Sequence, residues 1–223
     1  MSKAEAPVIA LDGPSASGKG TIAKRVARAL GFHYLESGAL YRLIALVSLR
    51  NEISKEKALA ETAATMGVVF RDEKIILEKQ DVTEDIRTEE CSNRASEVAK
   101  LPSVRSALLQ RQRAFRKPPG LVADGRDMGT VVFPDAALKV FLTASPEVRA
   151  IRRYNQLIEK GISANLRALS RDLAERDARD ANRPVAPLVP APDSQVLDST
   201  ALSIEAVADR IVGWYRERTG GPR

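Results

Sequence analysis

A glycine-rich segment near the N-terminus has the residue types and spacing of a phosphate-binding loop. Its residues, which match the pattern G-x4-G-K, are Gly13, Pro14, Ser15, Ala16, Ser17, Gly18, Lys19, Gly20 and Thr21. Glycines let the backbone curl so that successive N–H groups face phosphate oxygens, and the lysine bridges the β- and γ-phosphates of a nucleotide. Gly20 stands where the strict pattern has Ser or Thr. The segment predicts binding of a nucleoside triphosphate, and the alternative is a Gly/Ser-rich turn with a chance lysine.

Arginines beside small polar residues recur further along the chain. They matter because GTPase switches, motor ATPases and small-molecule kinases all share the phosphate loop. A phosphoryl transferase also needs cations for the acceptor phosphate and for the charge on the transferred group. The arginine segments are residues 36–42, the helix around Arg105, residues 125–130 and residues 175–183. This second set of cations favours a transferase, although each arginine taken alone is compatible with a surface ion pair.

Alternating apolar strands and amphipathic helices must position these segments. Short apolar runs predict buried strands at residues 8–12, 32–35, 121–124, 138–143 and 195–198. Helical periodicity and capping residues predict helices at residues 19–30, 39–49, 54–66, 145–160, 163–182 and 203–218. Strands separated by helices predict an α/β fold with a parallel sheet, flanked by helices and connected by right-handed crossovers.

The pattern changes in the middle of the chain. Short strands at residues 68–70 and 75–77, separated by a polar turn, predict a hairpin or meander. Helices are expected after it, at residues 85–99 and 103–116. We therefore predict an inserted module at residues 60–97, within a core formed by residues 1–59 and 98–223.

The composition excludes several classes of protein. The 223 residues are 44% hydrophobic and 29% charged, which suffices for a folded core. Cys91 and His33 are each the single residue of their type, so neither a disulfide framework nor a zinc site is expected, and no metal is expected to be held by protein ligands alone. No apolar run approaches the roughly 18 residues of a membrane span, and the N-terminus has no signal-peptide pattern. A soluble, cytoplasmic protein without a membrane partner is expected.

The charge balance leaves the kind of anionic ligand open. The net charge is +6, and the basic excess lies after residue 100. Nucleic acid, an anionic surface and a small phosphorylated ligand would each suit this charge. Because aromatic residues make up only 4% of the chain, little is available to stack on bases, and no nucleic-acid partner is expected.

Several of these motifs together resemble those of the bacterial cytidylate kinases, which belong to the nucleoside monophosphate kinases and phosphorylate CMP and dCMP. The resemblance extends from about Val8 to Leu202. Its most distinctive parts are residues 13–21, 37–42, 125–135 and 176–190. It implies a P-loop α/β kinase whose inserted module binds the nucleoside monophosphate and whose helical lid lies at about residues 154–165. The implied substrates are ATP and CMP or dCMP, with Mg²⁺ held mainly through phosphates and water, and a monomer is expected.

The resemblance also implies roles for individual residues. The implied catalytic residues are Lys19, Arg126, Arg176, Arg179 and Arg183. The implied substrate-binding residues are Ser37, Arg42, Ser96, Arg105, Asp124, Arg126, Asp127, Arg176, Asp180 and Arg183. Within this set, the acceptor phosphate would be held by Arg42, Arg126 and Arg183, because guanidinium groups match phosphate oxygens bidentately. The cytosine edge would be read by Ser96, Arg105 and Asp127.

Each of the remaining residues has an alternative interpretation. Arg176 and Asp180 would hold ribose hydroxyls and Arg179 would approach the ATP phosphates, although their helical spacing equally suits a ladder of ion pairs. Asp124 would orient a Mg²⁺-bound water or cap the following turn. For the whole chain, the alternatives are a kinase of the same fold acting on UMP or AMP, a non-catalytic P-loop switch and a basic RNA-associated protein.

Overall fold

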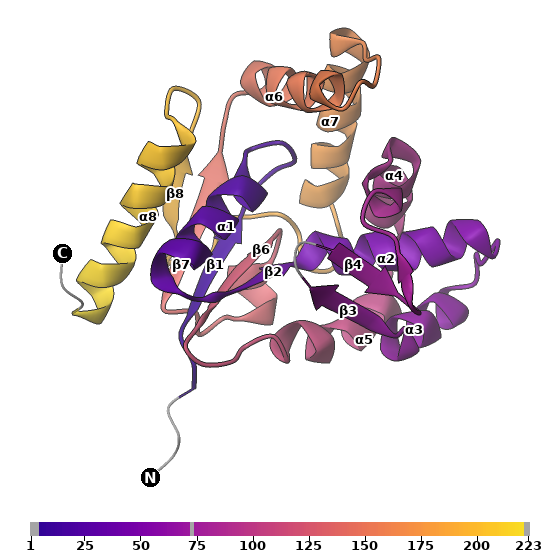
Figure 1. Ribbon diagram of the computed structural model, residues 1–223, viewed down its shortest axis with the longest axis horizontal. Coiled ribbons are helices and arrows are strands. Elements are labelled where there is room, and N and C mark those ends of the chain that lie inside the picture. Colours follow the sequence, from indigo (N-terminus) through magenta and orange to yellow (C-terminus); the bar gives the residue numbers. More distant parts are fainter. Residues whose placement is uncertain (1–4, 72–73, 221–223) are drawn as a thin grey trace. The chain divides into compact units, whose positions relative to one another are not determined.

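The computed structural model describes residues 5–71 and 74–220 (Figure 1). The chain divides into two compact units, each described by itself below. The first unit contains the residues up to Leu35 and those from Phe115 onward, and the second contains Glu36–Ala114. None of the helices within the described residues is both long and apolar enough to cross a membrane.

The first unit is built on a parallel sheet. Within the described residues it has five strands in the order β2-β6-β1-β7-β8. Their bounds are β1 Val8–Asp12, β2 His33–Glu36, β6 Leu121–Gly125, β7 Leu138–Thr143 and β8 Gln195–Asp198. Strand β1 pairs in parallel with both β6 and β7, and β7 pairs in parallel with β8. The predicted parallel α/β sheet is therefore confirmed, and loops that follow neighbouring strands leave the same edge of it.

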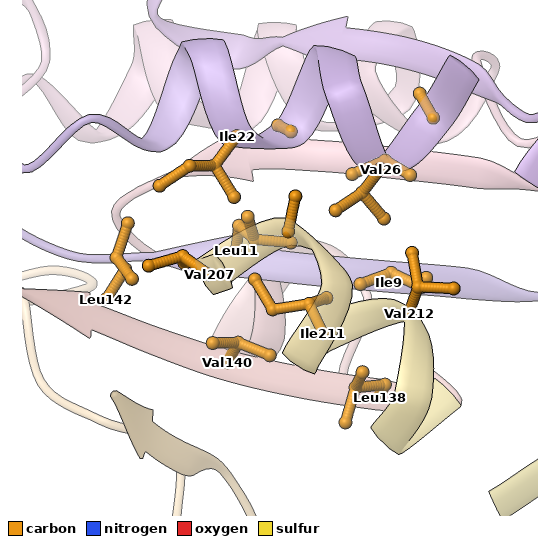
Figure 2. Close-up of a cluster of buried hydrophobic side chains, with 14 of the residues drawn as sticks. Ile9, Leu11, Ile22, Val26, Leu138, Val140, Leu142, Val207, Ile211 and Val212 are labelled. Carbon is orange, nitrogen blue, oxygen red and sulfur yellow. The ribbon is translucent and has the colours of Figure 1, made fainter. Parts of the chain in front are cut away.

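Helices α1 (Lys19–Leu30) and α8 (Ile204–Thr219) cover the sheet. They contact each other, α1 packing on β6 and α8 on β7. Figure 2 shows how their apolar side chains meet those of β1 and β7 in one buried cluster, whose labelled members are Ile9, Leu11, Ile22, Val26, Leu138, Val140, Leu142, Val207, Ile211 and Val212. Because this cluster contains side chains of β1 and α1, which flank the phosphate loop, burial of apolar surface holds the two ends of that loop in place.

Helices α6 (Pro146–Glu159) and α7 (Leu166–Ala181) pack against each other. As expected, α6 begins after the cap Ser145, whose side chain accepts the N–H of Val148, with a proline in the first turn. Helix α7 begins three residues later than the expected residue 163, because the side chain of Asn165 accepts the N–H of Ala168 and caps it there. The connection contains Gly161, at a φ of 72°.

The second unit combines four α-helices with a small antiparallel sheet among the described residues. The elements are α2 Ser37–Arg50, α3 Glu56–Thr65, β3 Val68–Arg71, β4 Lys74–Leu77, β5 Gln80–Asp81, the 3₁₀ turn η1 Asp85–Arg87, α4 Glu89–Val98 and α5 Pro102–Arg113. The helix expected at residues 85–99 is divided, because Thr88 accepts the N–H of Cys91 and starts α4 anew. The expected hairpin is present as β3 and β4.

This compact unit is wider than the module predicted at residues 60–97. Helix α2 packs on α4, and α3 packs on α5. The guanidinium of Arg111, on α5, also donates to the backbone oxygens of Ala63, Ala64 and Met66 at the end of α3. These contacts place α2 and α3 in the same unit as the small sheet. The sequence pattern changes only near residue 68, so it does not indicate that α2 and α3 belong to this unit.

Candidate functional site

The phosphate loop connects β1 to α1, with a backbone that only certain residues can adopt. Gly13 and Gly18 have φ values of 147° and 90°, in the region that favours glycine. A Cβ atom on Gly13 would lie 2.0 Å from the carbonyl oxygen of Leu142, so a larger residue has no space there. The loop therefore curls directly into the N-terminus of α1, as a site for phosphate requires.

Lys19 lies buried inside this loop. Its ammonium donates to the carbonyl oxygen of Pro14 at 2.7 Å and to Oγ of Ser17 at 3.2 Å. Burial, and then the positive charge of Arg126, lower the pKa of Lys19 to about 7, against the opposing effect of the Asp124 carboxylate. The lysine is held where a phosphate would meet it, in surroundings that disfavour its charge until an anion arrives.

This pKa makes ATP binding depend on pH. Bound phosphates favour the charged ammonium, so above pH 7 binding must be accompanied by proton uptake at Lys19. We expect the affinity for ATP to fall between pH 7.5 and 9, by up to about tenfold per pH unit. Calorimetry in two buffers of different ionisation enthalpy measures both the affinity and the proton uptake. Lys19→Arg, whose guanidinium stays charged, is the control and should remove the proton uptake. Constant wild-type affinity without proton uptake would contradict the prediction.

Ser15 joins the loop to the rest of the first unit through each of its polar groups. Its N–H donates to Oδ1 of Asp177 at 3.3 Å, and its carbonyl oxygen accepts from Arg149 at 3.2 Å. Its Oγ accepts from Arg126 at 2.9 Å. Arg149 and Asp177 also form an ion pair. Helices α6 and α7 are thus tied to the loop by Arg149 and Asp177, two residues that sequence reasoning missed, because their partner lies far away along the chain.

Three of the predicted catalytic arginines surround Asp180. Nε of Arg126 donates to its carboxylate at 2.9 Å, and Nε of Arg183 donates to its backbone oxygen at 3.3 Å. Burial works to raise the pKa of Asp180, but the charges of Arg126, Arg183 and Arg176 outweigh it and hold that pKa below its usual range. The structure therefore brings these three arginines and Asp180 together and links the group to the phosphate loop through Arg126.

Arg179 has a different environment. It is half-buried on α7, and its Nε donates to the backbone oxygen of Glu175, one turn earlier in the same helix, at 3.4 Å. This bond does not lead to the phosphate loop. Its predicted contact with the ATP phosphates stays a prediction.

Asp124 stands beside the position where the loop departs from the strict pattern. The hydroxyl of Tyr34 donates to its Oδ2 at 3.4 Å. A Cβ atom on Gly20 would lie 3.4 Å from the same oxygen, so the glycine leaves space next to a carboxylate. Among the residues that the structure describes, no group of three or more His, Cys, Asp or Glu side chains gathers as a metal site. A carboxylate beside a glycine of the phosphate loop fits Mg²⁺, which prefers oxygen ligands and retains several waters.

Asp12, the last residue of β1, is a second carboxylate at this edge of the sheet. Its two oxygens accept the N–H groups of Met128 and Gly129, each at 2.8 Å. Burial raises the pKa of Asp12 to about 7, although the two N–H groups act to lower it. Sequence reasoning missed this residue, and the available signal was an acidic residue that ends an otherwise apolar strand.

A cavity of about 210 Å³ adjoins the loop. Its wall includes Arg152, which donates to the backbone oxygen of Ser17 at 3.1 Å and to the backbone oxygen of Ser199 at 2.8 Å. The cavity is lined by Ala16, Ser17, Gly18, Thr21, Ile22, Arg152, Asn155, Gln156, Glu159, Ser199, Leu202, Ser203, Ile204 and Val207. Beyond the phosphate loop and α1, this wall is assembled from α6, the segment between β8 and α8, and the start of α8, and only its part within residues 154–165 belongs to a segment that the sequence singled out.

Four predicted substrate-binding residues lie in the second unit. Ser37 is the buried first residue of α2. Arg42, also on α2, forms an ion pair with Glu36 at 3.0 Å. Nε of Arg42 and Oγ of Ser96 are buried without a hydrogen-bond partner among the described residues. Buried polar atoms without partners are uncommon in folded proteins, so both atoms suit contact with a ligand.

Arg105 is the most constrained of these four. It is buried on α5, where its guanidinium donates to the carbonyl oxygen of Ala99 at 3.2 Å. The same group lies over the ring of Tyr41, 5.7 Å from its centroid. A cation over an aromatic face is attracted by the ring quadrupole, which limits the directions in which the guanidinium can point.

Solved structures support the fold of the chain. It matches the structure of an uncharacterized protein from Eubacterium ventriosum with a TM-score of 0.51 at 12% identity, covering 94% of this chain and 98% of that one. It also matches an unliganded sugar kinase from Janibacter sp. with a TM-score of 0.50 at 14% identity, covering 98% and 99% of the two chains. At these identities the likeness concerns the fold alone.

Sequence comparisons are more specific. The chain is 59% identical over 214 residues to the cytidylate kinase of Paraburkholderia phymatum, covering 95% of this chain and 94% of that protein. It is 58% identical over 213 residues to the cytidylate kinase of Burkholderia pseudomallei, covering 95% and 93%. The model of the cytidylate kinase family matches residues 9–217. With this match along nearly its whole length, the chain belongs to the cytidylate kinase family.

Proposed function

We propose that this protein transfers the γ-phosphoryl group of ATP to CMP or dCMP, giving ADP and CDP or dCDP. The observation that carries the proposal is the position of Arg126. Its guanidinium donates to Ser15 of the phosphate loop at 2.9 Å and to Asp180 of the arginine cluster at 2.9 Å. A cation between the donor loop and the other arginines can stabilise charge on a phosphoryl group as it moves between two nucleotides.

The donor side of the reaction is assigned to the phosphate loop. The ATP phosphates are bound by residues 13–21, through backbone N–H groups that exclude Pro14, which has none, and Ser15, whose N–H donates to Asp177, and through the ammonium of Lys19. The cavity beside Arg152 is our assignment for the nucleoside part of ATP, because it adjoins the loop and combines apolar and polar lining residues. Bound Mg²⁺ neutralises phosphate charge, and the residue that we assign to its hydration shell is Asp124.

The acceptor side is assigned by the chemistry of each residue. In the first unit, Arg126 and Arg183 bind the CMP phosphate, and Asp127 accepts from the cytosine amino group. Asp180, with Arg176, contacts the ribose. The second-unit residues that we assign to CMP are Ser37, Arg42, Ser96 and Arg105.

We assign the lid to residues 154–165, which comprise the last residues of α6 and the connection to α7. Gly161 lies in this connection at a φ of 72°, in the conformation that glycine adopts at least cost. Closure of such a segment would exclude water, which otherwise competes with CMP for the γ-phosphoryl group. Arg179, on the following helix, is proposed to approach the ATP phosphates when the lid closes.

The proposed partners of the enzyme are small nucleotides, and we expect it to act as a monomer in the cytoplasm. The aromatic content of 4% supports the absence of a nucleic-acid partner, because single-stranded bases need aromatic faces on which to stack.

The direct test is ADP release in a coupled optical assay, with Mg·ATP and each of CMP, dCMP, UMP, AMP and GMP. Turnover that depends on CMP and dCMP, with the other acceptors weak, supports both the reaction and the choice of base. Strong turnover with UMP or AMP, and weak turnover with CMP, would show that the acceptor substrate is UMP or AMP. Absence of turnover with every acceptor, while ATP still binds, would overturn the kinase and favour a P-loop switch.

Asp127→Asn tests the assignment of the cytosine contact. A carboxylate accepts hydrogen bonds from the cytosine amino group, whereas an asparagine amide can also donate to the carbonyl oxygen that uracil has there. We expect the ratio of kcat/KM for CMP over UMP to fall by about tenfold, because the variant loses one hydrogen bond between the base and a charged group. Steady-state kinetics with both acceptors measure this ratio. An unchanged ratio would move base recognition to another residue.

A further inference from the structure

Asp12 connects two segments whose relative position matters for the proposed reaction. It is the last residue of β1 and directly precedes Gly13, the first residue of the phosphate loop. Its backbone belongs to the sheet, where it is aligned with Gly125 of β6 and Phe141 of β7. The residue is only 6% exposed, and its side chain faces the segment that follows β6.

That segment is a π-helical turn, η2 (Met128–Val132), immediately after Arg126 and Asp127. The carbonyl oxygen of Asp127 accepts the N–H groups of Val131 at 2.9 Å and Val132 at 3.2 Å, which closes the turn. The first N–H groups of any helical turn have no partner within it. Here these are the buried N–H groups of Met128 and Gly129, and both are accepted by the Asp12 carboxylate.

The side chain of Lys139 also lies close to the turn. A Cβ atom on Gly129 would lie 3.2 Å from Cγ and Cδ of Lys139 and 3.4 Å from Oδ2 of Asp12. The ammonium of Lys139 is itself held by Asp193 at 2.9 Å. A side chain at position 129 would therefore press on both the Lys139 side chain and the Asp12 carboxylate, which limits how the turn can lie.

We infer that Asp12 is a positioning residue that sets Arg126 and Asp127 relative to the phosphate loop. The inference rests on the proposed function, in which Arg126 and Asp127 bind CMP. A carboxylate is required because both of its oxygens accept N–H groups. An asparagine offers one acceptor and turns its own N–H₂ toward the second backbone donor. The turn must then move, and with it the two residues that precede it.

The test is Asp12→Asn, with steady-state kinetics for CMP, UMP and ATP. Because small misplacements of binding groups are costly, we expect kcat/KM for CMP to fall by about tenfold or more. We expect the CMP-over-UMP ratio to fall with it. The KM for ATP should change much less, because both Asp12 oxygens bond to the turn, and the Asp12 charge ranks behind burial, Arg126 and Asp124 in its effect on the pKa of Lys19. Hydrogen exchange of residues 125–135 should accelerate.

Two further variants separate positioning from general stability. Val212→Ala removes part of the apolar cluster that α1 and α8 form with β1 and β7, and it should lower the melting temperature without changing the CMP-over-UMP ratio. Gly129→Ala keeps the carboxylate but pushes the same turn from the side of Lys139, and it should reproduce the kinetic pattern of Asp12→Asn. It carries the test if Asp12→Asn does not fold.

Three results would overturn the inference. They are equal losses for CMP and ATP, an unchanged CMP-over-UMP ratio in both turn variants, and unchanged exchange of residues 125–135. The proposed function is tested separately by the wild-type protein. If the wild type shows no CMP-dependent turnover in the same assay, the proposed function fails. In that case the exchange measurement still decides whether Asp12 holds the turn, and the assignment of its role to CMP binding falls.

Discussion

Lys19→Met is expected to lower the turnover number with CMP by about 10²–10³-fold, the usual cost of removing a group that stabilises transferred charge. Methionine has a similar length but carries no charge, so it leaves the loop filled. The ammonium that it replaces is buried and lies within hydrogen-bond distance of Pro14 and Ser17. Bound phosphates would replace these protein contacts. The loss therefore reflects the missing cation and not an altered loop backbone.

The measurement for Lys19→Met is the kcat of ADP release with saturating CMP, together with the Kd for ATP. Lys57→Met, at an exposed position of α3, is the control for loss of a lysine charge and should retain wild-type kinetics. A turnover number within about threefold of wild type would contradict the assignment of Lys19 to the transferred phosphoryl group.

Arg126→Ala is the second substitution with a large expected effect, again about 10²–10³-fold in kcat/KM for CMP. The guanidinium donates to Ser15 and Asp180, and the carboxylates of Asp180 and Asp124 raise its pKa against the effect of burial, so it remains charged. Without it, the acceptor phosphate and the moving phosphoryl group lose a cation that both would share. ATP binding should suffer much less, because the charge of Arg126 also lowers the pKa of Lys19.

Removal of Arg126 should in turn raise the pKa of Lys19, and a variant with a more fully charged lysine should show a weaker pH dependence of ATP binding. Arg126→Lys retains charge without the bidentate group, and an intermediate activity is expected. Arg210→Ala, at an exposed position of α8, is the control for arginine removal. An unchanged turnover number and KM for CMP in Arg126→Ala would exclude the assigned role.

Local patterns in the sequence were sufficient for the elements that carry the donor loop. The apolar run of β1, the glycines at positions 13 and 18 and the helical periodicity of α1 all act within about twenty residues of one another. Backbone conformation at a glycine and the start of a helix at a cap such as Ser145 depend on immediate neighbours, and these predictions agree with the structure. The capped start of α4 at Thr88 was missed, because a continuous helical pattern hid it.

The arginine cluster was predicted by resemblance to a family, not by geometry. Residue types in the segments 125–130 and 175–183 suggested phosphate binding. Their spacing in the sequence does not indicate that Arg126 forms an ion pair with Asp180. The structure supplies that contact, at 2.9 Å. It also divides the predicted set, since Arg126 contacts the loop, whereas the described bond of Arg179 remains within its own helix.

By itself, the sequence determined the strands, the phosphate loop and the chemistry that such a loop serves. Tertiary structure decided which distant groups complete the loop. Asp12 meets Met128 across 116 positions, and Arg149 meets Ser15 across 134. Such partners become neighbours only because the sheet order places β6 and β7 on either side of β1. The sequence gives only the type of each carboxylate or guanidinium side chain. Its function depends on the donors and acceptors that the fold brings to it.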